Sequence, residues 1–308
     1  MPRRRTALSR TAVARTSVAR TAVARALPLA LAVALTAGCG LLPGDSDGTP
    51  RQRFRDALAE ARAAVEAEVD KAVAQAEEQQ AGDTGDIAGG QAPQVDAIRT
   101  DTNTAFDYDE YTKTLEQVIG SLEAYWAREL PKSFDVPYSG PTRYAYYRPD
   151  QGPGPSCGGE QAPPKNAFYC PTDDFIAWDE TGLLIPYYVQ AGDFAAAFVL
   201  AHEFGHAMQA RLPQKEPRGI LNELQADCFA GAWARDTQDQ GFLDEGDLDE
   251  ATLAVFSARD LPGTDFTDPA AHGSGFERTR AFSDGYEGGP TTCYPAPAAD
   301  WVVGQTSR

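Results

Sequence analysis

Residues 195–212 read AAAFVLAHEFGHAMQARL and contain an H-E-x-x-H pattern formed by His202, Glu203 and His206. In an α-helix of 3.6 residues per turn, the two histidines lie one turn apart on the same face. Two imidazoles in this arrangement can share one Zn²⁺ ion, and Glu203 can reach a water molecule on that metal. Residues 194–201 are apolar on every side, which indicates a buried helix whose polar side chains need a partner such as a metal ion. The alternative is a chance match, which is rare in a chain with only three histidines.

A catalytic zinc site has three protein ligands and one position open to water. In one class of zinc site the third ligand is a Glu of the next helix, within the pattern E-x-x-x-D. Glu223 and Asp227 match this pattern, and Glu223 lies 17 positions after His206. We therefore predict Glu223 as the third ligand and Asp227 as the acceptor for the second ring nitrogen of a zinc-bound histidine. A third histidine six residues after the second, which marks another class, is excluded because Leu212 stands there. A solvated helix glutamate is the alternative for Glu223.

Two further residues are candidates for the same site. His272 is the remaining histidine, and it is either a surface residue, an outer hydrogen-bond donor or a catalytic group that stabilises an oxyanion. Arg278 is either a surface cation or a buried partner of an acid near the zinc. We predict the oxyanion role for His272 and the buried role for Arg278.

Four stretches of the sequence resemble the bacterial putative neutral zinc metallopeptidase family. They are LAHEFGHAMQ, NELQADCFAGAWA, an H-G pair followed by four residues and Arg278, and an upstream CG…FYCP.D pattern. The resemblance extends over roughly residues 108–293. It implies a compact zincin-like domain in which His202, His206 and Glu223 hold one catalytic Zn²⁺ and Glu203 is the general base.

The N-terminus predicts export. The first 25 residues contain seven arginines and no acid, and a short apolar run at residues 26–35 precedes Thr36 and the residues Ala-Gly-Cys39. This order is typical of a signal peptide and is too short for a spanning helix. The cysteine after Ala-Gly resembles a bacterial lipoprotein signal, although Thr36 stands where a leucine is usual. We expect a protein lipidated at Cys39 and anchored on the extracytoplasmic side; ordinary cleavage, which would give a secreted protein, is the alternative.

The charge of the chain restricts its partners. The net charge is −18, and loss of the seven arginines of the signal would leave about −25. Such a protein is not expected to bind nucleic acid or an anionic membrane surface. The expected partners are a protein or peptide substrate and, through the lipid anchor, the membrane.

Four cysteines remain besides Cys39, and four cysteines allow three pairings. We favour Cys157–Cys170, which closes a short Gly/Pro-rich loop, and Cys228–Cys293. Zinc ligation by these cysteines is the alternative, and the absence of a C-x-x-C spacing counts against it.

The expected domain order is a signal peptide (1–38), a tether with an Ala/Glu-rich helical stalk and linker (39–100), and a metallopeptidase domain (101–308). The fold class is α+β: a mainly helical zincin-like domain with a small antiparallel sheet, preceded by the signal peptide and a helical or disordered stalk. We predict helices near residues 108–130 (ended by Pro131), 192–212 (capped by Asp193), 218–235, 243–259 and 276–284. Strands are predicted within 137–148 and 167–179. Residues 175–178 are expected to form the edge that pairs with an extended substrate.

These features predict a zinc-dependent endopeptidase of the cell envelope. One alternative is an envelope-tethered zinc-binding or scaffold domain that no longer cleaves, and an intact Glu203 argues against it because a structural zinc site needs no general base. Another is a zinc amidase acting on cell-wall peptides, which would differ in substrate but not in chemistry.

Overall fold

The computed structural model describes residues 50–79, 85–87, 106–213, 219–265, 268 and 270–294. The chain divides into two compact units, Met1–Ala61 and Arg62–Arg308. The described residues of the first unit form the beginning of helix α1 (Pro50–Gln79). The predicted signal peptide and lipidation site lie outside the described residues.

The second unit is mostly helical, with one four-stranded sheet and one small hairpin. The helices that follow α1 are α2 (Tyr108–Phe134), α3 (Ile185–Ala191), α4 (Asp193–Arg211), α5 (Ile220–Asp239), α6 (Asp247–Ser257) and α7 (Gly275–Gly288), with a π-helical turn at Glu180–Leu184 and a 3-10 turn at Pro290–Cys293. The strands are β1 (Gly85–Ile87), β2 (Arg143–Tyr147), β3 (Ser156–Cys157), β4 (Glu160–Gln161), β5 (Ala167–Cys170) and β6 (Phe175–Asp179). This composition is the predicted α+β class.

The four-stranded sheet has the order β1-β2-β6-β5 and is mixed. The pairs β1–β2 and β5–β6 are antiparallel, whereas β2 and β6 are parallel. The prediction of an antiparallel sheet is therefore wrong for one pair, because β5 and β6 form a hairpin that turns β6 back beside β2. The prediction of an edge at residues 175–178 is also wrong: β6 is interior, and β5 is the edge strand. Strand β1 falls in the range predicted to be a linker.

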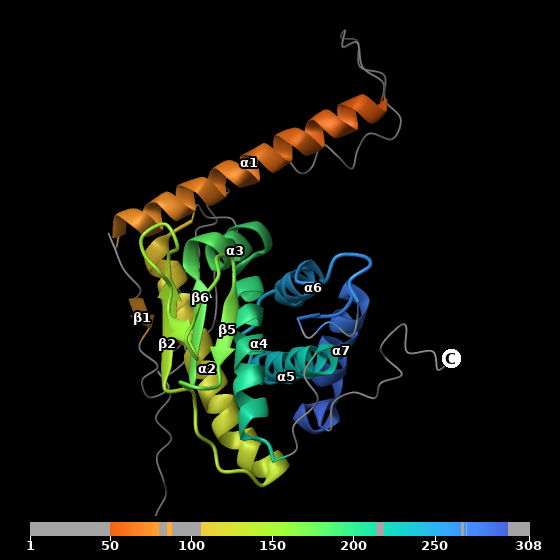
Figure 1. Cartoon of the computed structure of the whole chain (residues 1–308). Helices are drawn as coiled ribbons and strands as arrows, with labels where there is room; N and C mark the ends of the chain where they lie inside the picture. The colour runs from red at the N-terminus through yellow and green to blue at the C-terminus, as the bar shows by residue number, and fades with distance from the viewer. Residues whose placement is uncertain are drawn as a thin grey trace, which may run out of the picture. The chain divides into compact units, whose positions relative to one another are not determined.

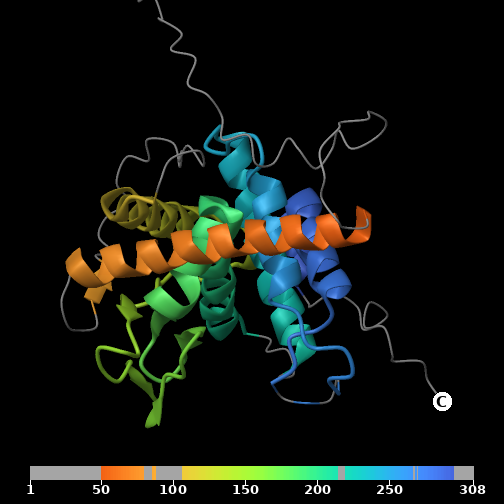
Figure 2. The same ribbon diagram turned by 90° about the horizontal axis from the view of Figure 1, so that it is seen from above.

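Helix α4 lies between the sheet and the helices α5, α6 and α7, as two perpendicular views show (Figures 1 and 2). Helices α2 and α4 cover one face of the sheet. Tyr144 of β2 stacks on Phe204 of α4 with ring centroids 6.0 Å apart, and its hydroxyl donates to Glu123 of α2. The opposite face carries a smaller cluster that contains Tyr147, Phe175 and other residues of β2, β5 and β6.

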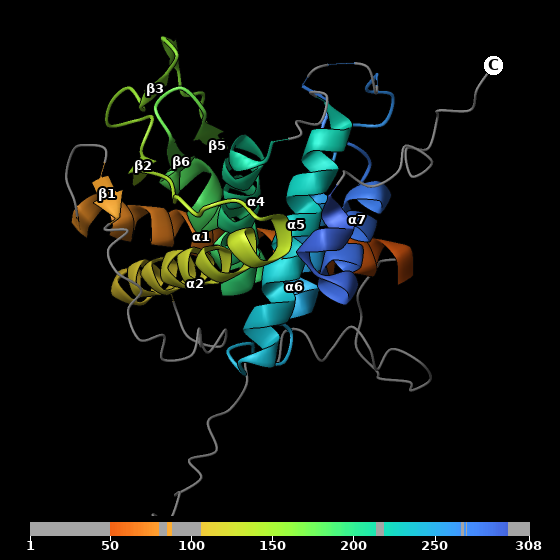
Figure 3. The same cartoon turned by 90° about the horizontal axis from the view of Figure 1, so that it is seen from below.

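Helices α5 and α7 pack with their backbones in contact (Figure 3). A Cβ atom at Gly231 would lie 1.9 Å from the carbonyl oxygen of Phe282, and one at Gly285 would lie 1.8 Å from that of Cys228. Only glycine permits this approach. The disulfide Cys228–Cys293 joins α5 to the turn that follows α7, and Cys157–Cys170 joins β3 to β5. Both predicted pairings are confirmed.

Two predicted details of the helix ends are wrong. Helix α2 continues through Pro131 to Phe134, because Phe134 packs edge-on against Phe229 and Tyr294 and this contact offsets the hydrogen bond that the proline cannot make. Asp193 does not cap α4 but is its first residue. Glu250 of α6 accepts the hydrogen bond of the Phe194 amide instead, across 3.0 Å.

None of the helices within the described ranges is long and apolar enough to cross a membrane.

Candidate metal centre

Helix α4 presents its two histidines side by side, as the spacing predicts. The Nε2 atoms of His202 and His206 lie 3.2 Å apart, with the two rings nearly perpendicular at 85°. His202 is buried and His206 is partly buried. The helix is buried because its own residues are apolar on nearly every side. The two rings line a cleft.

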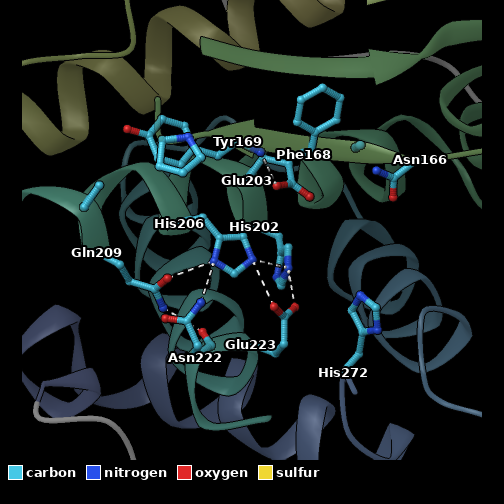
Figure 4. A pocket seen from close by; sticks show the side chains of 13 residues that line it. Asn166, Phe168, Tyr169, His202, Glu203, His206, Gln209, Asn222, Glu223 and His272 are labelled. Carbon is cyan, nitrogen blue, oxygen red and sulfur yellow. Dashed lines mark hydrogen bonds and ion pairs between the residues drawn. The ribbon is translucent and has the colours of Figure 1, made fainter. Parts of the chain in front are cut away.

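Glu223, in the first turn of α5, completes a group of three. Its Oε2 lies 3.2 Å from His202 Nε2, and its Oε1 lies 3.4 Å from His206 Nε2. The two helices come this close because residue 205 is glycine: a Cβ atom there would lie 2.9 Å from the Cα of Ala226. The structure thus brings together the three residues that the sequence predicted as ligands (Figure 4).

The spacing of these three donors fits zinc. Bonds of 2.0–2.2 Å to nitrogen and oxygen, at tetrahedral angles, place neighbouring ligand atoms about 3.3–3.5 Å apart. The observed separations are 3.2 Å between the two Nε2 atoms, and 3.2 and 3.4 Å from these atoms to the nearer oxygen of Glu223, which are close to that spacing. Two imidazoles and one carboxylate are also a donor set found in catalytic zinc sites. The residues present therefore fit the metal.

Glu203 lies next to this group and faces the cleft (Figure 4). Its Oε2 accepts a hydrogen bond from the backbone N–H of Tyr169 in β5, across 3.0 Å. The sequence could not indicate this contact, because any non-proline residue at position 169 offers the same N–H.

A buried ion pair of Asp227 and Arg278 contacts Nδ1 of His202, the ring nitrogen that does not face the other candidate ligands. Asp227, one turn after Glu223 on α5, places Oδ1 2.8 Å from Nδ1 of His202. Arg278 of α7 donates to both oxygens of Asp227 across 2.8 Å, and it is 2% exposed. Arg278 therefore occupies the second of its two predicted places, as the buried partner of an acid near the histidines.

Gln209 has the corresponding place beside His206, and the sequence-based prediction missed it. Its Oε1 lies 2.8 Å from Nδ1 of His206, and its amide nitrogen donates to the carbonyl of Asn222 across 2.6 Å. The signal that could have found it is spacing, because a residue three positions after a histidine lies on the same helix face.

The electrostatics of the group favour positive charge at its centre. Burial disfavours a protonated ring, but the charge and hydrogen bond of Asp227, with a hydrogen bond to Glu223, raise the pKa of His202 to about 10. Burial likewise opposes ionisation of Glu223, yet the nearby rings of His206 and His202 hold its pKa well below the usual range. Arg278 is the largest influence that keeps the pKa of the buried Asp227 low. Both carboxylates are thus held ionised, as cation binding requires.

These side chains line an open cleft of about 740 Å³. Its other walls come from β5 and the residues beside it, from the end of α4, from the start of α5 and from the loop before α7. They are Asn166, Ala167, Phe168, Tyr169, Pro171, Gln209, Ala210, Asn222 and His272. The His272 side chain is 51% exposed and lies on the same side of the cleft as Glu223 (Figure 4). Asp260 accepts the backbone N–H groups of His272 and Gly273 and lies 3.6 Å from Nδ1 of His272.

The chain is similar to one known protein family and to relatives from bacteria. A sequence profile described as "Putative neutral zinc metallopeptidase" matches residues 81–295. The chain is 31% identical over 214 residues to "Uncharacterized protein YpfJ" of Escherichia coli K12, a match that covers 60% of this chain and 71% of the relative. It is 31% identical over 163 residues to "Uncharacterized protein Rv2575" of Mycobacterium tuberculosis H37Rv, covering 43% of this chain and 56% of the relative. No solved structure matches.

Proposed function

The chain belongs to the putative neutral zinc metallopeptidase family, and from this premise we propose that it is a zinc-dependent endopeptidase of the cell envelope. The observation that carries the proposal is the grouping of His202, His206 and Glu223, whose ligand atoms lie within 4.8 Å of one another. Glu203 faces the same cleft. A closed structural zinc site would use four protein ligands and would have no need of this carboxylate.

His202, His206 and Glu223 would hold the ion. When bound, zinc supplies Lewis acidity, which polarises the scissile carbonyl and acidifies a water molecule. Asp227 and Gln209 fix the ring orientation and tautomer of the two histidines through Nδ1, which leaves each Nε2 lone pair directed to the centre of the group.

Glu203 carries the proton in the proposed reaction. Its carboxylate accepts a proton from the attacking water, while the water oxygen forms a bond to the carbonyl carbon. The same carboxyl group then delivers that proton to the amide nitrogen as the carbon–nitrogen bond breaks. His272 supports this step by donating a hydrogen bond to the carbonyl oxygen as negative charge develops on it, and Asp260 holds the backbone of His272 in place.

The edge strand β5 supports an extended polypeptide as the substrate. Ala167 and Tyr169 line the cleft, and no strand within the described residues pairs with β5 on the side that faces away from β6. A peptide that adds to this edge would run past Glu203. We therefore assign the edge that pairs with the substrate to residues 167–170, in place of the residues 175–178 expected from the sequence.

The location of the protein is part of the proposal. The basic and apolar N-terminal segment and the sequence Ala-Gly-Cys39 support export and lipid anchoring on the extracytoplasmic side. Mass spectrometry of the native protein tests this directly: we expect an acylated Cys39 as the first residue. A mature protein that begins at a residue other than an acylated Cys39 would contradict the lipid anchor.

The activity is tested with the full chain, loaded with zinc, on a denatured protein substrate beside the Glu203→Gln variant. We expect cleavage by the wild type, loss of cleavage with a chelator, and near-complete loss in the variant with zinc still bound. If neither protein cleaves the substrate although both bind stoichiometric zinc, this result would contradict a general endopeptidase. Peptidoglycan peptides would then separate a cell-wall amidase from a scaffold domain.

A further inference from the structure

The edge strand β5 and the metal helix α4 meet at Tyr169, which contacts α4 with two different groups. Its backbone N–H donates to Oε2 of Glu203 across 3.0 Å (Figure 4). Its phenol oxygen accepts a hydrogen bond from Nη1 of Arg211, eight residues further along α4, across 3.0 Å. Tyr169 is therefore bound to α4 at two positions, Glu203 and Arg211.

The direction of the Tyr169 amide follows from the register of the sheet. In an antiparallel pair, residues that exchange hydrogen bonds alternate with residues that do not. The amide of Asp179 donates to the carbonyl of Asn166 across 2.8 Å, so Phe168 also faces β6 with its backbone groups. Ala167 and Tyr169 direct theirs the other way, into the cleft. Of these two outward amides, that of Tyr169 is bound by Glu203.

Arg211 fixes the position of this strand. Its Nη2 donates to Oδ1 of Asp174, in the turn between β5 and β6, across 2.7 Å, and to the carbonyl of Gly140 across 2.9 Å. The Tyr169 hydroxyl donates to the same Asp174 oxygen across 2.8 Å. The Arg211 side chain is only 10% exposed, so these charge-assisted bonds form largely out of solvent. They tie the end of α4 to strand β5 and to the turn of the hairpin.

We propose that Tyr169 is a positioning residue for Glu203, and that Arg211 and Asp174 act through it; this inference rests on the proposed function. The Tyr169 N–H occupies Oε2 of Glu203 and fixes the side-chain rotamer, so Oε1 is the oxygen that accepts the proton of the attacking water. The outward amide of Ala167, two residues earlier, is left for the substrate. The Tyr169 amide thus orients the base, and the Ala167 amide binds the peptide.

Proline substitutions separate these two roles, because each removes a single N–H. Proline is tolerated on an edge strand where the missing N–H does not face the neighbouring strand. We expect Tyr169→Pro to lower kcat by about 10- to 100-fold with a smaller change in KM, since small misplacements of a catalytic group have effects of this size. We expect Ala167→Pro to raise KM with a smaller effect on kcat. Tyr169→Ala retains the N–H and measures the loss of the phenol alone, so its kcat should exceed that of Tyr169→Pro.

A double substitution tests whether Arg211 acts through Tyr169. We expect Arg211→Gln to lower kcat roughly 3- to 10-fold in the wild-type background, as contacts between neighbours are coupled. In the Tyr169→Pro background the same substitution should have no further effect on kcat. Independent, multiplicative losses would contradict the proposed route.

Amide hydrogen exchange of the full chain, followed by NMR on ¹⁵N-labelled protein, tests the contact without any turnover. The Tyr169 amide should be protected and should exchange at least about tenfold faster in Glu203→Ala, whereas the Ala167 amide should exchange equally in both proteins. Equal exchange of the Tyr169 amide in the two proteins would overturn the inference, even in an active enzyme. A wild type without peptidase activity would count against the proposed function alone.

Discussion

Arg278 binds both carboxylate oxygens of Asp227 across 2.8 Å, and Asp227 in turn lies 2.8 Å from the ring of His202. A helix that contributes no metal ligand, α7, is in this way joined to the candidate metal centre through two buried side chains. The orientation of His202 therefore depends on the packing of α7 against α5.

Replacing Arg278 by methionine should weaken both the fold and the metal site. The substitution leaves the carboxylate of Asp227 buried without its cation, and removal of one partner of a buried pair costs about 3–5 kcal/mol. Loss of the fixed His202 orientation should reduce zinc affinity about 10- to 100-fold. Thermal unfolding and competition titration with a chelator measure the two effects. Arg280→Met is the matched control, because Arg280 lies on the same helix with its side chain 54% exposed; an equal loss in both variants would contradict the prediction.

A methyl group at position 205 should separate α4 from α5. In Gly205→Ala the new Cβ would lie 2.9 Å from the Cα of Ala226, so the helices must move apart and Glu223 must withdraw from the two histidines. We expect a loss of about 1–3 kcal/mol in unfolding free energy, as for other overpacked cores, and a lower zinc affinity. Gly152→Ala serves as the control, since no atom lies within 4 Å of a Cβ built there. Unchanged zinc binding by Gly205→Ala would show that the helices can adjust without disturbing the ligands.

The two glutamates of the site should separate cleanly in their effects. Glu223→Ala removes a ligand, so we expect zinc to be lost on dialysis. Glu203→Gln leaves all three ligands in place, so we expect stoichiometric zinc with turnover reduced by about 10²–10⁴-fold, the usual contribution of a general base. Metal analysis of the dialysed proteins, beside activity, decides between the roles. Retention of zinc by Glu223→Ala would require a different ligand set.

Gln209 should affect the metal rather than the fold. Gln209→Ala removes the acceptor next to Nδ1 of His206, and loss of such an outer partner lowers metal affinity about 10- to 100-fold. Gln209→Glu keeps an acceptor oxygen for Nδ1 of His206 but loses the donor to the Asn222 carbonyl, so it should bind zinc more tightly than the alanine variant and less tightly than the wild type. Chelator competition at fixed pH measures both. If the alanine variant binds zinc as tightly as the wild type, the contact has no role in holding the ring.

The start of α4 should make stability depend on pH. Asp193, Asp247 and Glu250 lie with their carboxylate atoms within 4.8 Å of one another. Burial raises the pKa of Asp247 to about 7, opposed by a hydrogen bond from the Asp244 backbone and assisted by the charges of Asp193 and Asp244. The folded state therefore binds a proton more tightly than the unfolded chain does. Stability from this carboxyl group is fully present below its unfolded pKa of about 4 and is lost as pH rises through 7.

Asp247→Asn removes this titration while keeping an oxygen acceptor for the Asp244 amide. We expect the variant to melt a few degrees above the wild type at pH 8, about 2–4 °C for each kcal/mol gained, and to melt close to the wild type at pH 4. Asp249→Asn, an exposed position on the same helix, should show no such difference. Thermal unfolding of the three proteins between pH 4 and 8 is the measurement; a variant that gains nothing at pH 8 would contradict the raised pKa.

The successes and failures of sequence-based prediction divide by the range of the interactions. Helical periodicity places His202 beside His206 and Glu223 beside Asp227, because residues four apart share a face whatever the rest of the chain does. The contacts between the two pairs depend on the packing of α4 against α5, which Gly205 permits. The edge strand was misassigned because strand order depends on hairpin direction. Composition predicted both strands of the β5–β6 hairpin but could not tell which one would lie inside the sheet.

The sequence by itself therefore determined the ligand types and their grouping on two helices, which depend on local spacing. It favoured the two observed disulfides among three possible pairings, and the structure decided between them. Only the tertiary structure decided that β5 borders the cleft, that the Tyr169 amide holds Glu203, and that Arg278 supports Asp227 from a third helix. These contacts join elements far apart in the chain, and one of them uses a backbone group that every residue type but proline possesses. Such contacts arise from the packing of whole helices and strands, so no spacing in the sequence specifies them.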